Sequence, residues 1–91
     1  MPRHEEITLT DGQWVQLTTA DVTALSFQVT EGCARIAGTT GAAAPTGQGW
    51  LYGPGKGEMN IGMDRLFPGI AARRVWAQMV GGPGRIMISH A

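Results

Sequence analysis

The stretch Val22–Thr30, VTALSFQVT, decides the fold class because apolar and polar side chains alternate along it. Successive side chains of a β-strand point to opposite faces of the sheet, so a strict alternation indicates a strand with one buried face. The buried face is expected to carry Leu25, Phe27 and Val29.

Similar but shorter alternating runs lie on both sides of this stretch, separated by glycine-containing turns. Asp11-Gly12 is expected to close a β-hairpin, since glycine adopts the positive φ that such turns need. We expect a helical turn near residues 64–67, with Asp64 as its cap and Pro68 ending it. The further expected strands are residues 7–9, 13–18, 33–37, 50–52, 58–62, 74–80 and 85–89. About seven or eight short strands of this spacing predict an all-β fold, a small β-sandwich or jelly roll.

The chain of 91 residues is expected to form a single domain over residues 1–91, in which residues 1–6 are an N-terminal arm. A domain of this size has a thin core and usually needs a disulfide, a metal or a partner subunit. Cys33 is the only cysteine, so no disulfide can form within the chain, and it is expected to be a small buried residue. His4 and His90 are far apart in the sequence, so neither a metal nor a cofactor is expected. Oligomerisation is therefore the expected source of additional stability.

The charges indicate which partners the chain does not suit. Seven basic and seven acidic residues cancel, whereas a nucleic-acid ligand needs a cationic field. Arg73-Arg74 is too small a basic group for a membrane surface, and no apolar run approaches the length of a membrane span. The first ten residues contain no apolar stretch of the kind found in secretory signals, so no such signal is expected. We therefore expect neither nucleic-acid nor membrane binding, and synthesis in the cytoplasm. Only 15% of the residues are charged, which favours a surface covered by neighbours.

No catalytic motif is complete, so the chain is not expected to be an enzyme. Gly55-Lys56 resembles part of a phosphate-binding loop, but Trp50 and Gly57 occupy the positions of its first glycine and its hydroxyl residue. The acidic residues lie mostly at turns and strand ends, where carboxylates are solvated. Cys33 has no histidine near it in the sequence to act as a base.

The strand RVWAQMV, Arg74–Val80, leaves two registers open. If Val75, Ala77 and Met79 face the core, Trp76 lies outside among polar residues, as at a subunit interface. In the other register Trp76 is itself a core residue, and Trp14 poses the same ambiguity. The loop Gly38–Gly49 has only small and polar side chains; it either lies flat along a neighbour or is a surface loop. The interface candidates are Trp76, Arg74, Gln78, Trp14, Ala43, Pro45, Glu5 and Glu6.

The second half of the chain resembles small structural proteins of tailed-bacteriophage particles. The resemblance rests on Thr40–Thr46 (TGAAAPT), Gly49–Tyr52, Pro54–Glu58 (PGKGE), Leu66–Gly69, Arg74–Ala77 and Ser89–Ala91. It implies a capsid decoration, or cement, protein that forms a homotrimer on the outer surface of the virion and stabilises the shell of the major capsid protein. A tail, baseplate or fibre component is the alternative within such particles. A carbohydrate-binding sandwich that stacks sugars on Trp14, Trp50 or Trp76 is the alternative from another class.

Overall fold

The structure is a computed structural model that describes residues 2–41, 43–45 and 49–90. Its elements are β1 (Arg3–Leu9), β2 (Val15–Gln16), β3 (Ala24–Glu31), β4 (Ala34–Thr39), β5 (Trp50–Tyr52), β6 (Gly57–Gly62), α1 (Met63–Leu66), β7 (Arg74–Met79) and β8 (Gly84–His90). The predicted all-β fold is confirmed, and the helical turn begins one residue earlier than expected. No helix in the described part of the chain is long and apolar enough to cross a membrane.

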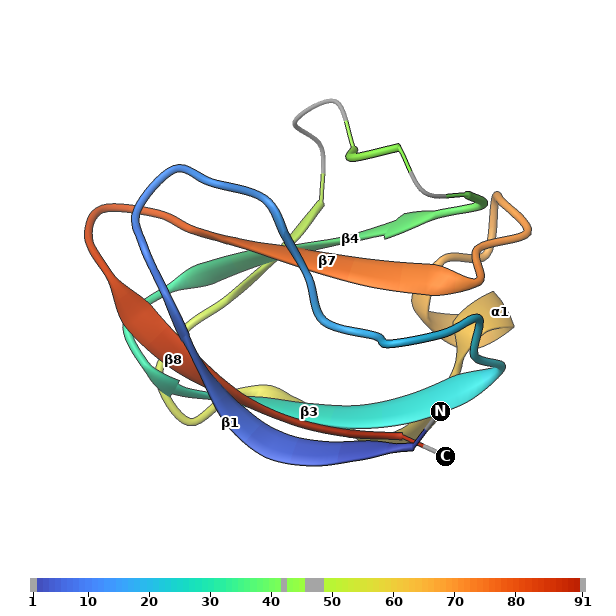
Figure 1. Ribbon diagram of the computed structural model, residues 1–91, viewed down its shortest axis with the longest axis horizontal. Coiled ribbons are helices and arrows are strands. Elements are labelled where there is room, and N and C mark those ends of the chain that lie inside the picture. The colour runs from blue at the N-terminus through green and yellow to red at the C-terminus, as the bar shows by residue number, and fades with distance from the viewer. Residues whose placement is uncertain (1, 42, 46–48, 91) are drawn as a thin grey trace.

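The strands form two four-stranded antiparallel sheets that pack face to face (Figure 1). The first has the order β1-β8-β3-β6 and the second the order β2-β7-β4-β5. Each strand of the first half of the chain therefore pairs with its counterpart counted from the end: β1 with β8, β2 with β7, β3 with β6, and β4 with β5. This is one long antiparallel hairpin rolled into two layers, which is the topology of a jelly roll.

The predicted hairpin at Asp11-Gly12 is wrong, although the turn itself is present. Gly12 has a φ of 79°, as expected, but β1 and β2 lie in different sheets. The same holds for Gly32, with a φ of 82°, between β3 and β4. A tight turn makes the chain change direction without specifying which strand becomes the neighbour. Here these turns carry the chain from one layer of the sandwich to the other.

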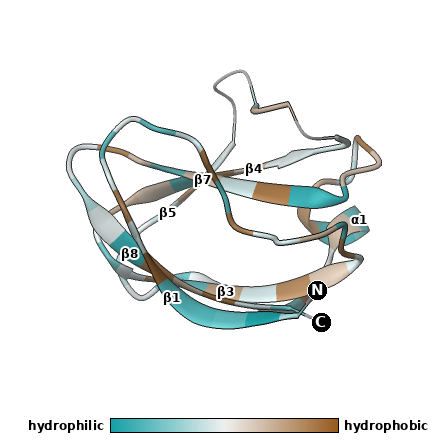
Figure 2. Ribbon diagram, in the orientation of Figure 1, coloured by the Kyte–Doolittle hydropathy of each residue, from teal (hydrophilic) through white to brown (hydrophobic). Residues whose placement is uncertain are grey.

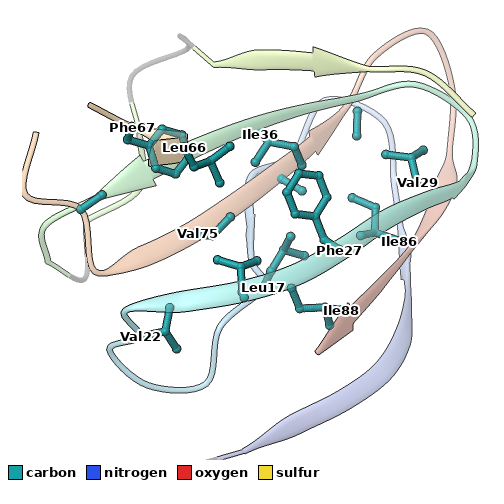
Figure 3. Packing of buried hydrophobic residues seen from close by; sticks show 14 of the residues in the cluster. Leu17, Val22, Phe27, Val29, Ile36, Leu66, Phe67, Val75, Ile86 and Ile88 are labelled. Atoms are coloured by element: carbon teal, nitrogen blue, oxygen red, sulfur yellow. The ribbon is translucent and has the colours of Figure 1, made fainter. Parts of the chain in front are cut away.

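The core lies between the two sheets (Figure 3). The face predicted for β3 is confirmed, since Leu25, Phe27 and Val29 are all buried. Figure 3 shows the ring of Phe27 reaching from β3 towards Ile36 of β4. The ring also meets the ring of Tyr52 edge to face, with centroids 4.9 Å apart. Phe27 thus contacts a side chain of the opposite sheet.

Residues 3–6 do not form the predicted arm but are the first half of β1. This strand pairs with β8 along its whole length, from Arg3 opposite His90 to Leu9 opposite Gly84. Its N-terminal half is hydrophilic, as its teal colour in Figure 2 shows. It is nevertheless held in place because Ile7 packs against the core and Leu9 is buried in it. Met1 lies outside the described residues.

Two smaller expectations are also corrected. Cys33 is exposed, because it lies in the turn before β4 and Ala34 takes the first inward position of that strand. Asp64 does not cap α1: the N-cap residue is Gly62, and no side chain donates or accepts a capping hydrogen bond there. Asp64 lies in the first turn instead, where a carboxylate interacts favourably with the helix N-terminus.

Candidate functional site

A groove of about 900 Å³ opens between the segment that joins β4 to β5 and the segment that follows α1. Its volume lies in the range of about 300–1,000 Å³ typical of ligand sites. Among the described residues it is lined by Ala37, Gly38, Thr39, Thr40, Gly41, Ala43, Pro45, Gly49, Trp50, Phe67, Pro68, Gly69 and Ile70. Residues 46–48, which belong to the loop that the sequence singled out, lie outside the described part.

One part of the groove lining exists because residue 38 has no side chain. A Cβ atom at Gly38 would lie 2.6 Å from Cδ2 of Phe67 and 2.9 Å from Cβ of Ala72. Phe67 can therefore pack directly on the backbone of β4. Its amide donates a hydrogen bond to the carbonyl of Met63 (2.9 Å), which fixes it at the end of α1. The glycine and the helix end together position the aromatic ring.

Trp50 provides the largest exposed apolar side chain in the groove. Its indole Nε1–H donates to the carbonyl of Leu66 (2.8 Å), which ties β5 to the end of α1. The side chain is held in place but is still 53% exposed, and Ile70 on the groove lining is 50% exposed. Gly49 allows this arrangement, because a Cβ atom there would lie 2.5 Å from the carbonyl oxygen of Ile36.

The polar groups of the groove are largely occupied within the chain. The hydroxyl of Thr39 accepts a hydrogen bond from Nε1 of Trp76 (2.9 Å) and donates one to the carbonyl of Gly41 (2.9 Å). The carbonyl of Thr39 accepts from the amide of Arg73 (3.0 Å). None of the described lining residues has an ionisable side chain. The groove therefore suits an uncharged, apolar surface rather than a charged ligand.

The structure decides between the two registers of β7. Val75, Ala77 and Met79 face the core, so Trp76 lies on the outer face of the sheet with Arg74 and Gln78. Trp76 is nevertheless only 9% exposed. It occupies the outer face predicted for an interface residue, but its side chain has little surface left to offer a partner.

The polar neighbours of Trp76 are also engaged within the chain. Arg74 Nε lies 2.8 Å from a carboxylate oxygen of Asp21, and the amide of Gln78 donates to the carbonyl of Gly12 (3.0 Å). Both interactions connect β7 to the segments that lead into or out of β2. Arg74 and Gln78 therefore stabilise the edge of this sheet by holding the segments on either side of β2 against β7.

The other predicted interface residues lie in three separate places. Glu5 and Glu6 belong to β1 in the opposite sheet: Glu5 pairs with Arg3, and Glu6 accepts a hydrogen bond from the hydroxyl of Thr30 (2.9 Å). Trp14 is half-buried just before β2. Only Ala43 and Pro45 line the groove.

Sequence reasoning missed the second wall of the groove, formed by Phe67, Pro68 and Ile70. The signal was the apolar run Leu66-Phe67 directly before Pro68-Gly69. It indicated the end of a helix, which is correct, but two large apolar residues at such a point also needed a surface to pack on. That surface is Gly38 of β4, nearly thirty positions away in the chain and therefore invisible to a local reading.

Tyr52 is the titratable group whose environment is most altered. Burial raises the pKa of its phenol to about 12, and the nearby negative charge of Glu58 acts in the same direction. The phenol donates a hydrogen bond to the Glu58 carboxylate (3.3 Å), which links β5 of one sheet to β6 of the other. Tyr52 is therefore a protonated donor at neutral pH.

We expect the Tyr52 phenol to titrate about two pH units later in the folded protein than in the unfolded chain, where the pKa is about 10. Because the folded-state value is the higher one, the stabilising contribution is complete below pH 10 and is lost as the pH rises towards 12. Tyr52 is the only tyrosine, so phenolate absorbance near 295 nm reports it alone. The same midpoint in native buffer and in concentrated urea would contradict the prediction.

The described residues contain no group of three His, Cys, Asp or Glu side chains placed to hold a metal ion. The groove is thus the most distinctive surface feature of the part of the chain that the structure describes. Comparisons of the chain with protein-family models, with curated proteins and with solved structures find no match.

Proposed function

We propose that this chain is a virion structural protein of the tailed-phage type, a decoration protein that binds the outer surface of the capsid shell as a homotrimer and stabilises it. The observation that carries the proposal is the apolar groove, with Trp50 and Ile70 exposed on it and no ionisable side chain among its described lining residues. Binding of another protein to such a surface is favourable because it removes apolar side chains from water.

The fold and the composition support the same proposal. Jelly rolls are found in viral capsid proteins and in lectins, although a fold alone does not determine a function. The segments on which the resemblance to small phage proteins rests include Gly49–Tyr52 and Leu66–Gly69, and both of these segments contribute residues to the groove. The resemblance and the groove therefore involve the same part of the chain.

The mechanism is to bridge neighbouring subunits of the major capsid protein. Each copy buries apolar surface against the shell, at about 25 cal/mol for each Å² removed from water. A single contact is weak, but a shell carries many copies, and subunits that are bridged at several points separate less readily. On this proposal Ala43, Pro45 and Trp50 contact the shell or a sister subunit, and no catalytic step is involved.

The test is to heat capsids of the phage that encodes the chain, with and without the purified protein. We expect the protein to raise the temperature at which the shells disrupt, and Ile70→Asp to abolish the increase because it places a charge in the apolar groove. Val80→Asp is the matched control: Val80 is also an exposed apolar residue, at 38%, but it does not line the groove. An unchanged disruption temperature with the wild-type protein would refute the proposal, and binding to tails instead would favour a tail component.

A carbohydrate-binding module is a second candidate, favoured by the exposure of Trp50. Of the three tryptophans, Trp76 is buried and Trp14 is half-buried, so Trp50 offers the most accessible ring for stacking a sugar. Binding on a glycan array that disappears in Trp50→Phe or Trp50→Ala, without any shift in capsid disruption by the wild-type protein, would support this candidate over the first.

A further inference from the structure

The two sheets have four outer edges, formed by β1 and β6 in one sheet and by β2 and β5 in the other. An outer strand presents unpaired backbone amides and carbonyls, to which a strand of another molecule can add. Proteins prevent this with very short edge strands, with charged side chains or with bulges.

Three of the edges are protected by length or by charge. β2 has two residues and β5 has three, so neither offers much backbone for pairing. β1 has seven residues, but it carries Glu5 and Glu6 side by side, and Arg3 pairs with Glu5. If β1 of a second copy paired with this edge, several of these charged side chains would lie close together, which opposes the pairing.

β6 is protected neither by short length nor by several charges. It has six residues, of which Glu58 alone is charged, and that carboxylate is already engaged by Tyr52. Its protection lies in the pairing with β3: Leu25 lies opposite Ile61 and Phe27 opposite Glu58, so that Ser26 alone faces both Met59 and Asn60. This is a β-bulge, which bends the strand and increases its twist.

Asn60 gives the bulge its shape. Its φ is 48°, the left-handed conformation that asparagine tolerates better than most residues, and no other non-glycine residue in the described part has a positive φ. The backbone amide of Asn60 donates a hydrogen bond to the hydroxyl of Ser26 (2.7 Å), so the Ser26 side chain accepts the bond that a backbone carbonyl would accept in a regular sheet. Met59 projects beside it and is 81% exposed.

We propose that the bulge at Met59–Asn60 is the device that prevents β6 of one copy from pairing with β6 of a second copy. Without the extra residue of the bulge, β6 is a straight edge of five residues with little charge. Two copies would then join antiparallel edges into one continuous sheet that spans both molecules. This inference does not depend on what the groove binds.

The sharpest test is to delete Met59 and replace Asn60 with Thr. The deletion leaves one residue opposite Ser26, so Glu58 and Ile61 keep the faces they have now, and threonine favours the extended backbone. We expect the variant to associate, with an apparent mass in sedimentation at least twice that of the wild type at equal concentration, because each chain offers one β6 edge for pairing. Placing Lys instead of Thr at position 60 of the deletion variant should restore the wild-type mass, because a lysine on an edge opposes pairing.

Two full-length variants keep the test valid if the deletion does not fold. Asn60→Val disfavours a positive φ and should promote association, whereas Asn60→Gly accepts it and should behave as the wild type. Met59→Thr removes the exposed apolar side chain but leaves the bulge, and should also behave as the wild type. The proposal is overturned if Asn60→Val and Asn60→Gly have the same mass, or if Met59→Thr alone changes it.

Discussion

Replacing Phe27 with alanine is expected to lower the free energy of unfolding by about 3–5 kcal/mol. Phe27 is 2% exposed, lies in the middle of β3, and meets the Tyr52 ring edge to face. Removal of its ring loses the apolar burial of one of the largest side chains in a thin core and leaves a cavity between the two sheets. The total free energy of unfolding of a small domain is about 5–15 kcal/mol, so this loss is a large fraction of its stability.

The measurement is urea unfolding followed by tryptophan fluorescence, compared with the wild type under the same conditions. Gln28→Ala is the matched control: it lies next to Phe27 on β3, but its side chain is exposed and donates a hydrogen bond to the carbonyl of Gly55 (3.2 Å), so a change of about 1 kcal/mol or less is expected. If the two variants had similar unfolding midpoints, Phe27 would not be the core residue that the structure describes.

Gly57→Ala is expected to cost about 3 kcal/mol, the second large effect, through overpacking rather than loss of contacts. A Cβ atom at this position would overlap the carbonyl oxygen of Phe27 and lie 2.6 Å from Cα of Gln28. Both of these atoms belong to the backbone of β3, so no side chain can turn away to make room. The start of β6 would have to separate from β3.

Gly53→Ala provides the comparison, because a Cβ atom there meets nothing within 4 Å and the backbone needs no positive φ. We expect Gly53→Ala to be neutral or slightly stabilising, since alanine restricts the unfolded chain more than glycine does. Thermal unfolding monitored by circular dichroism separates the two variants. Equal melting temperatures would mean that β6 does not approach β3 as closely as the structure indicates.

Features of the chain that depend on neighbouring residues follow from the sequence, whereas features that depend on distant residues do not. The alternation in β3 correctly assigned Leu25, Phe27 and Val29 to the core, because the period of a strand is a property of a few neighbouring residues. The pattern around Trp76 left two registers open, since Ala77 and Trp76 can each face inward in a plausible strand. Only the packing of the two sheets against each other settled it, with Val75, Ala77 and Met79 in the core between them.

The sequence by itself determined the approximate positions of most strands and of the tight turns, because alternation and positive φ at glycine are local properties of the backbone. It did not show that β1 begins at Arg3. Strand partners and the groove were decided only by the tertiary structure. β1 pairs with β8 and β3 with β6 because both sheets must bury their apolar faces at the same time, a condition on the whole chain. The groove exists because Gly38 of β4 leaves room for Phe67 after α1, and no local pattern relates two such distant positions.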